Sequence, residues 1–349
     1  MHAQTEQDSI AEAGEFNIYP LPVVYYTPET RFGFGGVGIS SFRFKGDWYA
    51  ERNSFFQIGG AYTQEDQLLF YLPFQLFLKQ NQYNVFGELG YYRYSYFFYG
   101  VGADLPQVNE ELYYVNFPRF RLNMTKLVAE NFYLGFRYWF DDYRVKQTES
   151  GGILSNELVT GANGGVVSSL GIIGLYDSRD NYNYPTKGSF LQALALPNST
   201  FLGSDFDFIR YSIDYVQYHK LFKQTVVAVN LFGVAISGNP PFNEQAFIGG
   251  REKMRGFYEG RFRDRNLLMA QVELRQWLIW KVGMVAFAGS GVVAPEMSQY
   301  ALSNLKHAAG IGFRYQLNEE DRINIRLDYG FGLSGTNSSG FYLTIGEAF

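Results

Sequence analysis

Apolar and polar residues alternate with a period of two along most of this chain. In residues 322–331, Ile323, Ile325 and Leu327 alternate with Asn324 and Arg326, and residues 131–140 and 268–280 repeat the pattern. Successive side chains of a β-strand point to opposite faces, so each segment has one apolar and one polar face. Segments of about ten residues or more are long enough to cross a bilayer as tilted strands. The pattern therefore favours a membrane β-barrel.

A water-soluble β-sandwich would show the same alternation, but two features argue against it. Its strands are usually only about 5–6 residues long, and the periodic segments here are longer. Charged residues on the polar face would be costly in a dry sandwich core, whereas the wet lumen of a barrel accommodates them. These charged residues are Arg137, Arg210, Asp214, Glu273, Arg275, Arg314, Arg326 and Asp328.

The alternation places fifteen strands. A bacterial single-chain barrel has an even number of strands, so we expect an all-β fold, a closed antiparallel transmembrane β-barrel of sixteen strands. The missing strand is expected between residues 67 and 126 or within 145–163. The fifteen segments are 31–43, 53–63, 67–78, 83–98, 111–125, 131–144, 164–177, 187–196, 205–219, 224–237, 266–280, 282–293, 305–317, 321–332 and 339–349.

Loop lengths indicate which end of the barrel faces which side of the membrane. If Phe349 ends at the periplasm, the short turns at 280–281 and 317–321 are periplasmic and the longer connections are extracellular. The longest connection is about residues 238–265. No Pro/Ser-rich linker separates a second domain, so we expect a flexible tail over residues 1–16 and a barrel over residues 17–349.

Composition agrees with an exported membrane protein. Of the 349 residues 19% are aromatic and 18% are charged, none is cysteine, and no run of about 18 apolar residues could form a spanning helix. A net charge of −5 argues against nucleic-acid binding. His2, His219 and His307 have no metal-ligand spacing and there is no cysteine nucleophile. We therefore expect no metal, no cofactor and no enzymatic activity.

Two motifs are more specific than the alternation. A turn between two predicted strands reads YDSRDN from Tyr176 and PTKGSF from Pro185, and its Asp and Asn residues favour a reversing backbone. The longest connection contains Gly249, Gly250 and Arg251, followed by Met254, Arg255, Gly256 and Phe257. The residues of the turn motif are Asp177, Arg179, Asp180, Asn181, Pro185, Lys187 and Gly188.

These motifs resemble those of the superfamily of outer-membrane assembly and translocation barrels, which includes the BamA/TamA group, the bacterial surface antigens, and the transporters of two-partner secretion. The turn is similar to the family's D-x-R-D-N…P-x-K-G turn, and residues 254–257 are similar to its V-R-G-F/Y motif. Residues 271–275 are similar to its E-L-R strand. The resemblance covers residues 170–349 most closely, and it implies a location in the outer membrane of a Gram-negative bacterium.

In that family the long loop folds back into the lumen and its arginine binds the inner wall, which implies the same role for Arg255. The usual partner is an aspartate in an F-x-D-x-G strand, and Gly289 stands at that position here. A guanidinium in a confined lumen requires a carboxylate or several carbonyls around it. Glu273 and Asp328, both predicted to point inward on nearby strands, are therefore the candidate partners of Arg255.

The two ends of the predicted barrel suggest a lateral seam. Residues 341–349 alternate and close on Phe349, which resembles the insertion signal of outer-membrane barrels. In the resembled family, the first and last strands can separate toward lipid. Glycine weakens strand packing, so the pairing of segment 31–43 with segment 339–349 would be labile. The alternative, which has equal weight, is that the glycines only allow the strand to curve. The glycines are Gly33, Gly35, Gly36 and Gly38.

The resemblance leaves three non-enzymatic functions open. Family members that fold or secrete proteins usually carry periplasmic POTRA domains, and only residues 1–30 precede the first predicted strand, so we expect a member without them. The leading hypothesis is assembly, insertion or translocation of outer-membrane proteins. The alternatives are an accessory subunit of a larger outer-membrane complex and a passive or selective pore. Expected partners are outer-membrane lipids and lipopolysaccharide, and other outer-membrane or periplasmic proteins.

Overall fold

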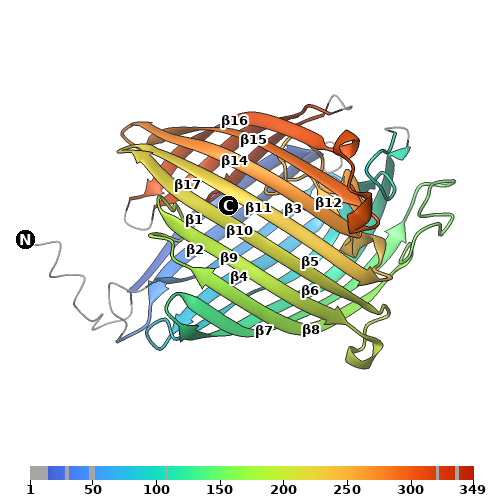
Figure 1. The fold of residues 1–349 in the computed structure, drawn as a ribbon, viewed down its shortest axis with the longest axis horizontal. Helices are drawn as coiled ribbons and strands as arrows, with labels where there is room; N and C mark the ends of the chain where they lie inside the picture. Colours follow the sequence, from blue (N-terminus) through green and yellow to red (C-terminus); the bar gives the residue numbers. More distant parts are fainter. Residues whose placement is uncertain (1–14, 28–30, 47–51, 107–108, 320–321, 335–337) are drawn as a thin grey trace, which may run out of the picture.

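Sixteen antiparallel strands form one sheet in which each strand pairs with the next along the chain. The structure, a computed structural model, describes residues 15–27, 31–46, 52–106, 109–319, 322–334 and 338–349. The sheet curls into a barrel of strongly tilted strands (Figure 1). Within the described residues, no helix is long and apolar enough to cross a membrane.

The first eleven strands of the chain and the last five make up this large sheet, and two short strands lie between them. The large sheet consists of β1 (Glu15–Thr27), β2 (Arg31–Arg43), β3 (Ser54–Thr63), β4 (Leu68–Leu78), β5 (Tyr83–Phe98), β6 (Glu111–Ala129), β7 (Phe132–Gln147), β8 (Gly164–Asp177), β9 (Gly188–Asn198), β10 (Phe208–Phe222), β11 (Thr225–Gly238), β14 (Asn266–Ile279), β15 (Val282–Ala294), β16 (Lys306–Asn318), β17 (Ile323–Gly332) and β18 (Ser339–Ile345). The short strands β12 (Ala246–Ile248) and β13 (Phe262–Asp264) pair with each other.

The predicted number of strands is confirmed, but the predicted place of the missing strand was wrong. It is β1, which pairs along its whole length with β2. Pro20 and Pro22 lie in the middle of β1, and proline inside a periodic segment argues against a strand when only the sequence is read. The expected tail falls outside the described residues over 1–14, and Glu15 and Phe16 already belong to β1.

The position of β1 also corrects the predicted seam. The strand with Gly33, Gly35, Gly36 and Gly38 is β2, which pairs with β1 on one side and β3 on the other. These glycines therefore do not lie at an end of the sheet. The end strands are β1 and β18, and among the described residues no ladder joins them. We call the boundary between β1 and β18 the seam.

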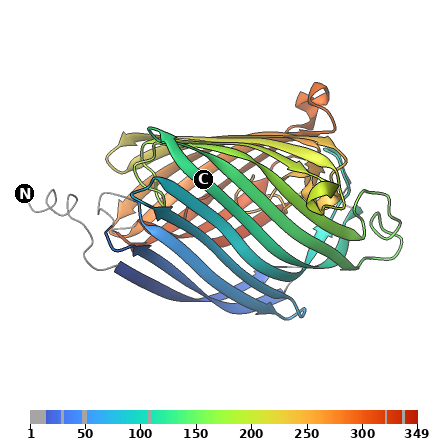
Figure 2. The same cartoon turned by 90° about the horizontal axis from the view of Figure 1, so that it is seen from below.

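The alternation along each strand separates a lipid-facing belt from the lumen. In β14, Leu268, Val272 and Leu274 are exposed on the outside, while Met269 and Glu273 are buried on the inside. The turns at 130–131, 223–224 and 280–281 lie at one end of the barrel, and residues 99–106 and 148–163 lie at the other (Figure 2).

The exposed belt predicts direct contact with lipid. Leu170, in the middle of β8, is 47% exposed on the outer face. We expect Leu170→Lys to lower the free energy of unfolding by about 2–4 kcal/mol, because a lysine at the bilayer midplane loses its hydration. Urea unfolding in phospholipid vesicles, followed by tryptophan fluorescence, measures this change.

The matched control is Leu302→Lys, because Leu302 is 87% exposed in the connection between β15 and β16. It should change the free energy of unfolding by no more than about 0.5 kcal/mol. Equal effects of the two substitutions would contradict a lipid-facing position for Leu170.

Candidate functional site

The connection between β11 and β14, residues 239–265, folds into the barrel; we call it the lumen loop. Ile248, Met254, Phe257 and Phe262 of this loop are almost completely buried. They share one apolar core with inward-facing wall residues, among them Leu267, Met269 and Val293. Burying these side chains together is the main favourable term that holds a loop inside a wet lumen. The predicted folding of this loop into the lumen is confirmed.

The backbone of the lumen loop lies directly against β17 at Gly256. Gly256 has φ +116°, and a Cβ at this position would lie 2.5 Å from the carbonyl carbon of Phe331. Only glycine tolerates both the positive φ and the missing space. The backbone N–H of Gly256 donates to the Tyr342 hydroxyl of β18 (3.0 Å), and the Ser338 hydroxyl donates to its carbonyl (2.7 Å). The loop therefore contacts both of the last two strands.

Next to this glycine, Arg255 is 1% exposed and contacts both of its predicted partners. One terminal nitrogen of its guanidinium pairs with Glu273 on β14 and the other pairs with Asp328 on β17. The guanidinium carbon also lies 3.7 Å from the centre of the Phe287 ring on β15. Arg255 thereby connects the loop to three strands of the wall.

The two carboxylates are shared with three wall arginines. Arg275 donates to Glu273 (2.8 Å), Arg314 donates to Asp328 (2.6 Å), and Arg326 lies 3.5 Å from Asp328. Arg314 also pairs with Glu347 beyond the end of β18 (2.7 Å). We call this set the arginine network; its members, with side chains at most 3% exposed, are Arg255, Glu273, Arg275, Arg314, Arg326, Asp328 and Glu347.

The energetics of such a network favour one arrangement over others. Desolvating buried ion pairs consumes most of their Coulomb attraction, so the intact network adds little net stability. Removing one member leaves uncompensated buried charge, which is strongly unfavourable. The network therefore specifies where the loop lies more than it strengthens the barrel.

Gly289 on β15 stands where the resembled family has an aspartate, and other side chains occupy the space beside it. A Cβ on Gly289 would lie 3.0 Å from Cγ of Gln271 and 3.5 Å from Cγ of Met254. Gln271 uses this space to accept a hydrogen bond from the backbone N–H of Met254 (3.0 Å) and to donate to the carbonyl of Glu252 (3.0 Å). The position that would hold the aspartate thus leaves room for a side chain that fixes the loop backbone.

The end of the chain turns into the lumen after β18. Phe349 packs against Val216, Tyr218 and Ala228 of β10 and β11, and its carbonyl accepts a hydrogen bond from Arg275 (2.7 Å). The prediction that Phe349 lies at the seam was wrong, because the contact between Glu347 and Arg314 directs the chain inward. Burial alone would raise the pKa of Glu347, but the charges of Arg314 and Arg275 hold the pKa below its usual value.

The turn motif closes the end of the barrel that carries the short turns. Asp177 pairs with Arg179 (2.8 Å) and with Arg52, which precedes β3 (2.5 Å). Asp180 pairs with Arg322, which precedes β17 (3.1 Å). Because β3 and β17 lie on opposite sides of β8 and β9 in the strand order, the turn reaches across the lumen.

The turn residues form the reversing backbone that their types predict. The Asn181 side chain accepts hydrogen bonds from the backbone N–H groups of Asn183 and Tyr184. Asp180 accepts hydrogen bonds from the backbone of Thr186 and Lys187, and Pro185 precedes both residues. Burial tends to raise the pKa of Asp180, but these bonds hold the pKa below its usual value. The distant partners Arg52 and Arg322 carry no signal in the sequence that links them to the turn.

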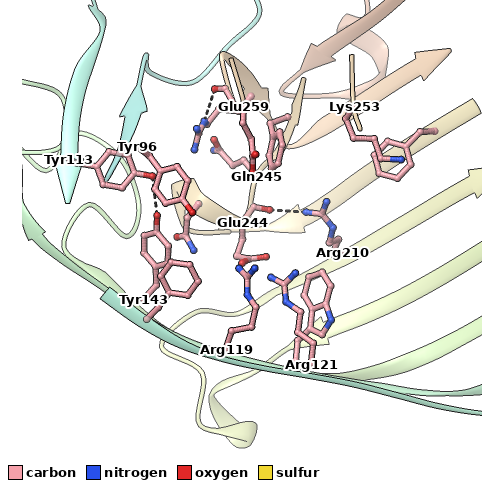
Figure 3. A pocket seen from close by; sticks show the side chains of 17 residues that line it. Tyr96, Tyr113, Arg119, Arg121, Tyr143, Arg210, Glu244, Gln245, Lys253 and Glu259 are labelled. Atoms are coloured by element: carbon pink, nitrogen blue, oxygen red, sulfur yellow. Dashed lines mark hydrogen bonds between the residues drawn. The ribbon is translucent and has the colours of Figure 1, made fainter. Parts of the chain in front are cut away.

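A cavity of about 310 Å³ remains between the lumen loop and the opposite wall. Arg119, Arg121 and Arg210 point toward Glu244 of the loop (Figure 3). Arg119 and Arg121 share Asp141 (3.0 Å each), and Arg210 donates to the backbone carbonyl of Glu244 (2.9 Å). Burial, and then the charge of Asp141, raise the pKa of Glu244. The cavity lies on the side of β5–β7, next to the place where Phe242 of the loop packs against Phe98, Tyr113 and Tyr143 of these strands.

The described part of the chain has no group of three or more His, Asp or Glu residues that could hold a metal ion. What the site can do follows from its contacts. The lumen loop, the last two strands and the inward-turned chain end share one set of buried charges.

Comparison with known proteins gives the family. The Omp85 superfamily domain matches residues 55–349. The outer membrane protein assembly factor BamA of Nitratidesulfovibrio vulgaris is 26% identical over 196 residues, which cover 50% of this chain and 24% of that protein. The matched region is thus about a quarter of the length of that relative.

Solved structures give the same fold. BamA from Haemophilus ducreyi lacking POTRA domains 1–3 is similar with a TM-score of 0.57 at 15% identity, covering 96% of this chain and 69% of that chain. CdiB from Acinetobacter baumannii is similar with a TM-score of 0.59 at 12% identity, covering 96% of this chain and 65% of that chain. At these identities the likeness concerns the barrel alone.

The arginine network predicts a large effect of removing Arg255. We expect Arg255→Ala to lower the free energy of unfolding by about 3–5 kcal/mol, because Glu273 and Asp328 lose a buried counter-ion. Urea unfolding in phospholipid vesicles measures this difference.

Arg251→Ala is the matched control on the same loop. The Arg251 side chain is 65% exposed and pairs with the exposed Glu252, so its removal should change stability by less than about 1 kcal/mol. A loss for Arg255→Ala no larger than for Arg251→Ala would show that the network does not hold the loop.

Proposed function

This chain belongs to the Omp85 superfamily, and on that premise we propose that it assists the assembly, insertion or translocation of proteins at the outer membrane. It is an outer-membrane β-barrel related to BamA and CdiB. The curated relative is described as an outer membrane protein assembly factor. That description supports the proposal for this chain.

The observation that carries the proposal is the connection between the docked loop and the last strands. Arg255 and Arg314 both bind Asp328 on β17, and Arg314 binds Glu347 beyond β18. The loop, β17 and the chain end thus depend on the same charges, and they lie beside the edge strand β18, which no ladder joins to β1 in the part of the chain that the structure describes. We infer that the docked loop controls how easily β1 and β18 separate.

Because no ladder joins the described residues of β1 and β18, an open seam leaves the backbone groups of these edges facing hydrocarbon. Lipid offers no hydrogen-bond partners, so each unpaired N–H or C=O group costs several kcal/mol. A strand of another membrane protein can supply the missing partners by adding to the open edge. The need of these backbone groups for hydrogen-bond partners would let the seam assist insertion without any covalent chemistry.

The pore alternative receives less support. The lumen loop fills one side of the lumen, and the turn motif crosses the end with the short turns. A large steady single-channel conductance would favour the pore. We also propose outer-membrane lipids and lipopolysaccharide as contacts of the exposed belt, and outer-membrane or periplasmic proteins as partners.

Depletion of the protein in its native host tests the proposed function. We expect quantitative proteomics of the outer membrane to show a broad fall in other β-barrel proteins, because their strands lose a site of insertion. Re-expression of the unchanged protein or of Arg251→Ala should restore them, and re-expression of Arg255→Ala should restore them less.

Two other outcomes decide between the alternatives. Loss of only one or two proteins would favour an accessory subunit of a dedicated complex. An unchanged outer-membrane proteome would overturn the proposed function.

A further inference from the structure

The two edges of the seam differ in the hydrogen bonds that their backbones can make. In an antiparallel sheet the N–H and C=O groups of one residue point to the same neighbouring strand, and successive residues point to opposite neighbours. In a strand without bulges, one hydrogen bond between known residues therefore determines to which neighbouring strand the backbone groups of every residue point.

On β1 the residues that face the seam are those with even numbers. The backbone N–H of Gln64 donates to the carbonyl of Phe32 (2.9 Å), so even residues of β2 face β3 and odd residues face β1. Leu21 lies opposite Val37, and the register from Glu15 to Thr27 has no shift. Odd residues of β1 therefore bond to β2. Pro20 and Pro22 face the seam.

This placement removes backbone donors from the middle of the β1 edge. Proline has no N–H group, so no donor faces the seam between Ile18 and Val24. That interval is about 20 Å at about 3.3 Å per residue. A strand paired with β1 would leave two carbonyl groups without donors in hydrocarbon, at several kcal/mol each.

The β18 edge is complete by the same reasoning. The N–H of Gly332 donates to the carbonyl of Ser338, and the N–H of Gly346 donates to the carbonyl of Asn324 (2.9 Å each). Even residues of β18 therefore face β17. The odd residues face the seam with both backbone groups; they are Ser339, Phe341, Leu343 and Ile345.

The side chains on this edge suit a membrane environment. Phe341 is 65% exposed and Leu343 is 54% exposed on the outer face of the barrel. A strand that continues the sheet from β18 would place its own alternate side chains beside them, so these side chains must be apolar.

We propose that β18 is the edge to which a further strand adds, and that Pro20 and Pro22 close the β1 edge to such addition. The partner is an extended segment of another membrane β-barrel, antiparallel to β18, with apolar residues on its lipid face. This inference rests on the proposed function and specifies which edge receives the inserted strand.

Disulfide trapping with a defined peptide tests the proposal. The chain has no cysteine, so single-cysteine variants report one position each. The probe is a synthetic peptide with the sequence of residues 266–279, itself a lipid-facing strand, in which Ala270 is replaced by cysteine. It is added to the full chain in phospholipid vesicles that carries either Leu343→Cys on β18 or Val24→Cys on β1.

We expect at least about tenfold more peptide disulfide with Leu343→Cys than with Val24→Cys, because two missing hydrogen bonds in hydrocarbon exceed 1.4 kcal/mol. Adding Pro20→Val and Pro22→Val to Val24→Cys should raise its yield to within about threefold of Leu343→Cys, because the donors are restored. A peptide of scrambled sequence should give little product at either position.

Three results would overturn the proposal: equal or greater trapping at Val24→Cys with both prolines present, no gain when the prolines are replaced, or no trapping at Leu343→Cys. The test is separate from that of the proposed function. If the peptide is trapped at β18 but depletion leaves the outer-membrane proteome unchanged, the proposed function is contradicted and the assignment of β18 as the receiving edge is supported.

Discussion

The burial of Arg255 is the constraint on which the rest of this structure depends. A guanidinium that is 1% exposed must keep its carboxylates, and Glu273 and Asp328 come from strands on different sides of β15 and β16. Holding them in place requires Arg275, Arg314 and Arg326 as further counter-ions. Because the intact network is nearly neutral in stability and its broken forms are costly, it defines one position for the lumen loop.

The same constraint reaches the seam. Glu347 joins the network, so the chain leaves the sheet after Ile345 and turns inward, which leaves β18 only seven residues long against thirteen in β1. The prolines of β1 act on the other side of the seam by removing donors. A short complete edge therefore faces a longer edge with missing donors. An edge strand normally invites pairing, and here only one of the two edges is equipped for it.

Much of this could be predicted from sequence because it depends on periodicity and on short motifs. The alternation predicted the barrel and fifteen of its strands, and the even strand number of such barrels gave the total of sixteen. Inward alternation selected Glu273 and Asp328 as the residues that contact Arg255. The errors have local physical causes. Pro20 and Pro22 hid β1, which misplaced the seam onto β2, and the inward turn at Glu347 removed Phe349 from the last strand. Contacts such as that of Arg52 with Asp177 arise only from closure of the barrel.

The most direct test of the central claim is hydrogen exchange of the backbone amides in phospholipid vesicles, comparing the unchanged protein with Arg255→Ala. If the arginine network connects the loop to the last strands, exchange should become faster in residues 249–257 and also in β17 and β18. Exchange in β5, β6 and β7, whose lumen side borders the cavity, should change little. Faster exchange confined to the loop, with β17 and β18 unchanged, would contradict the account.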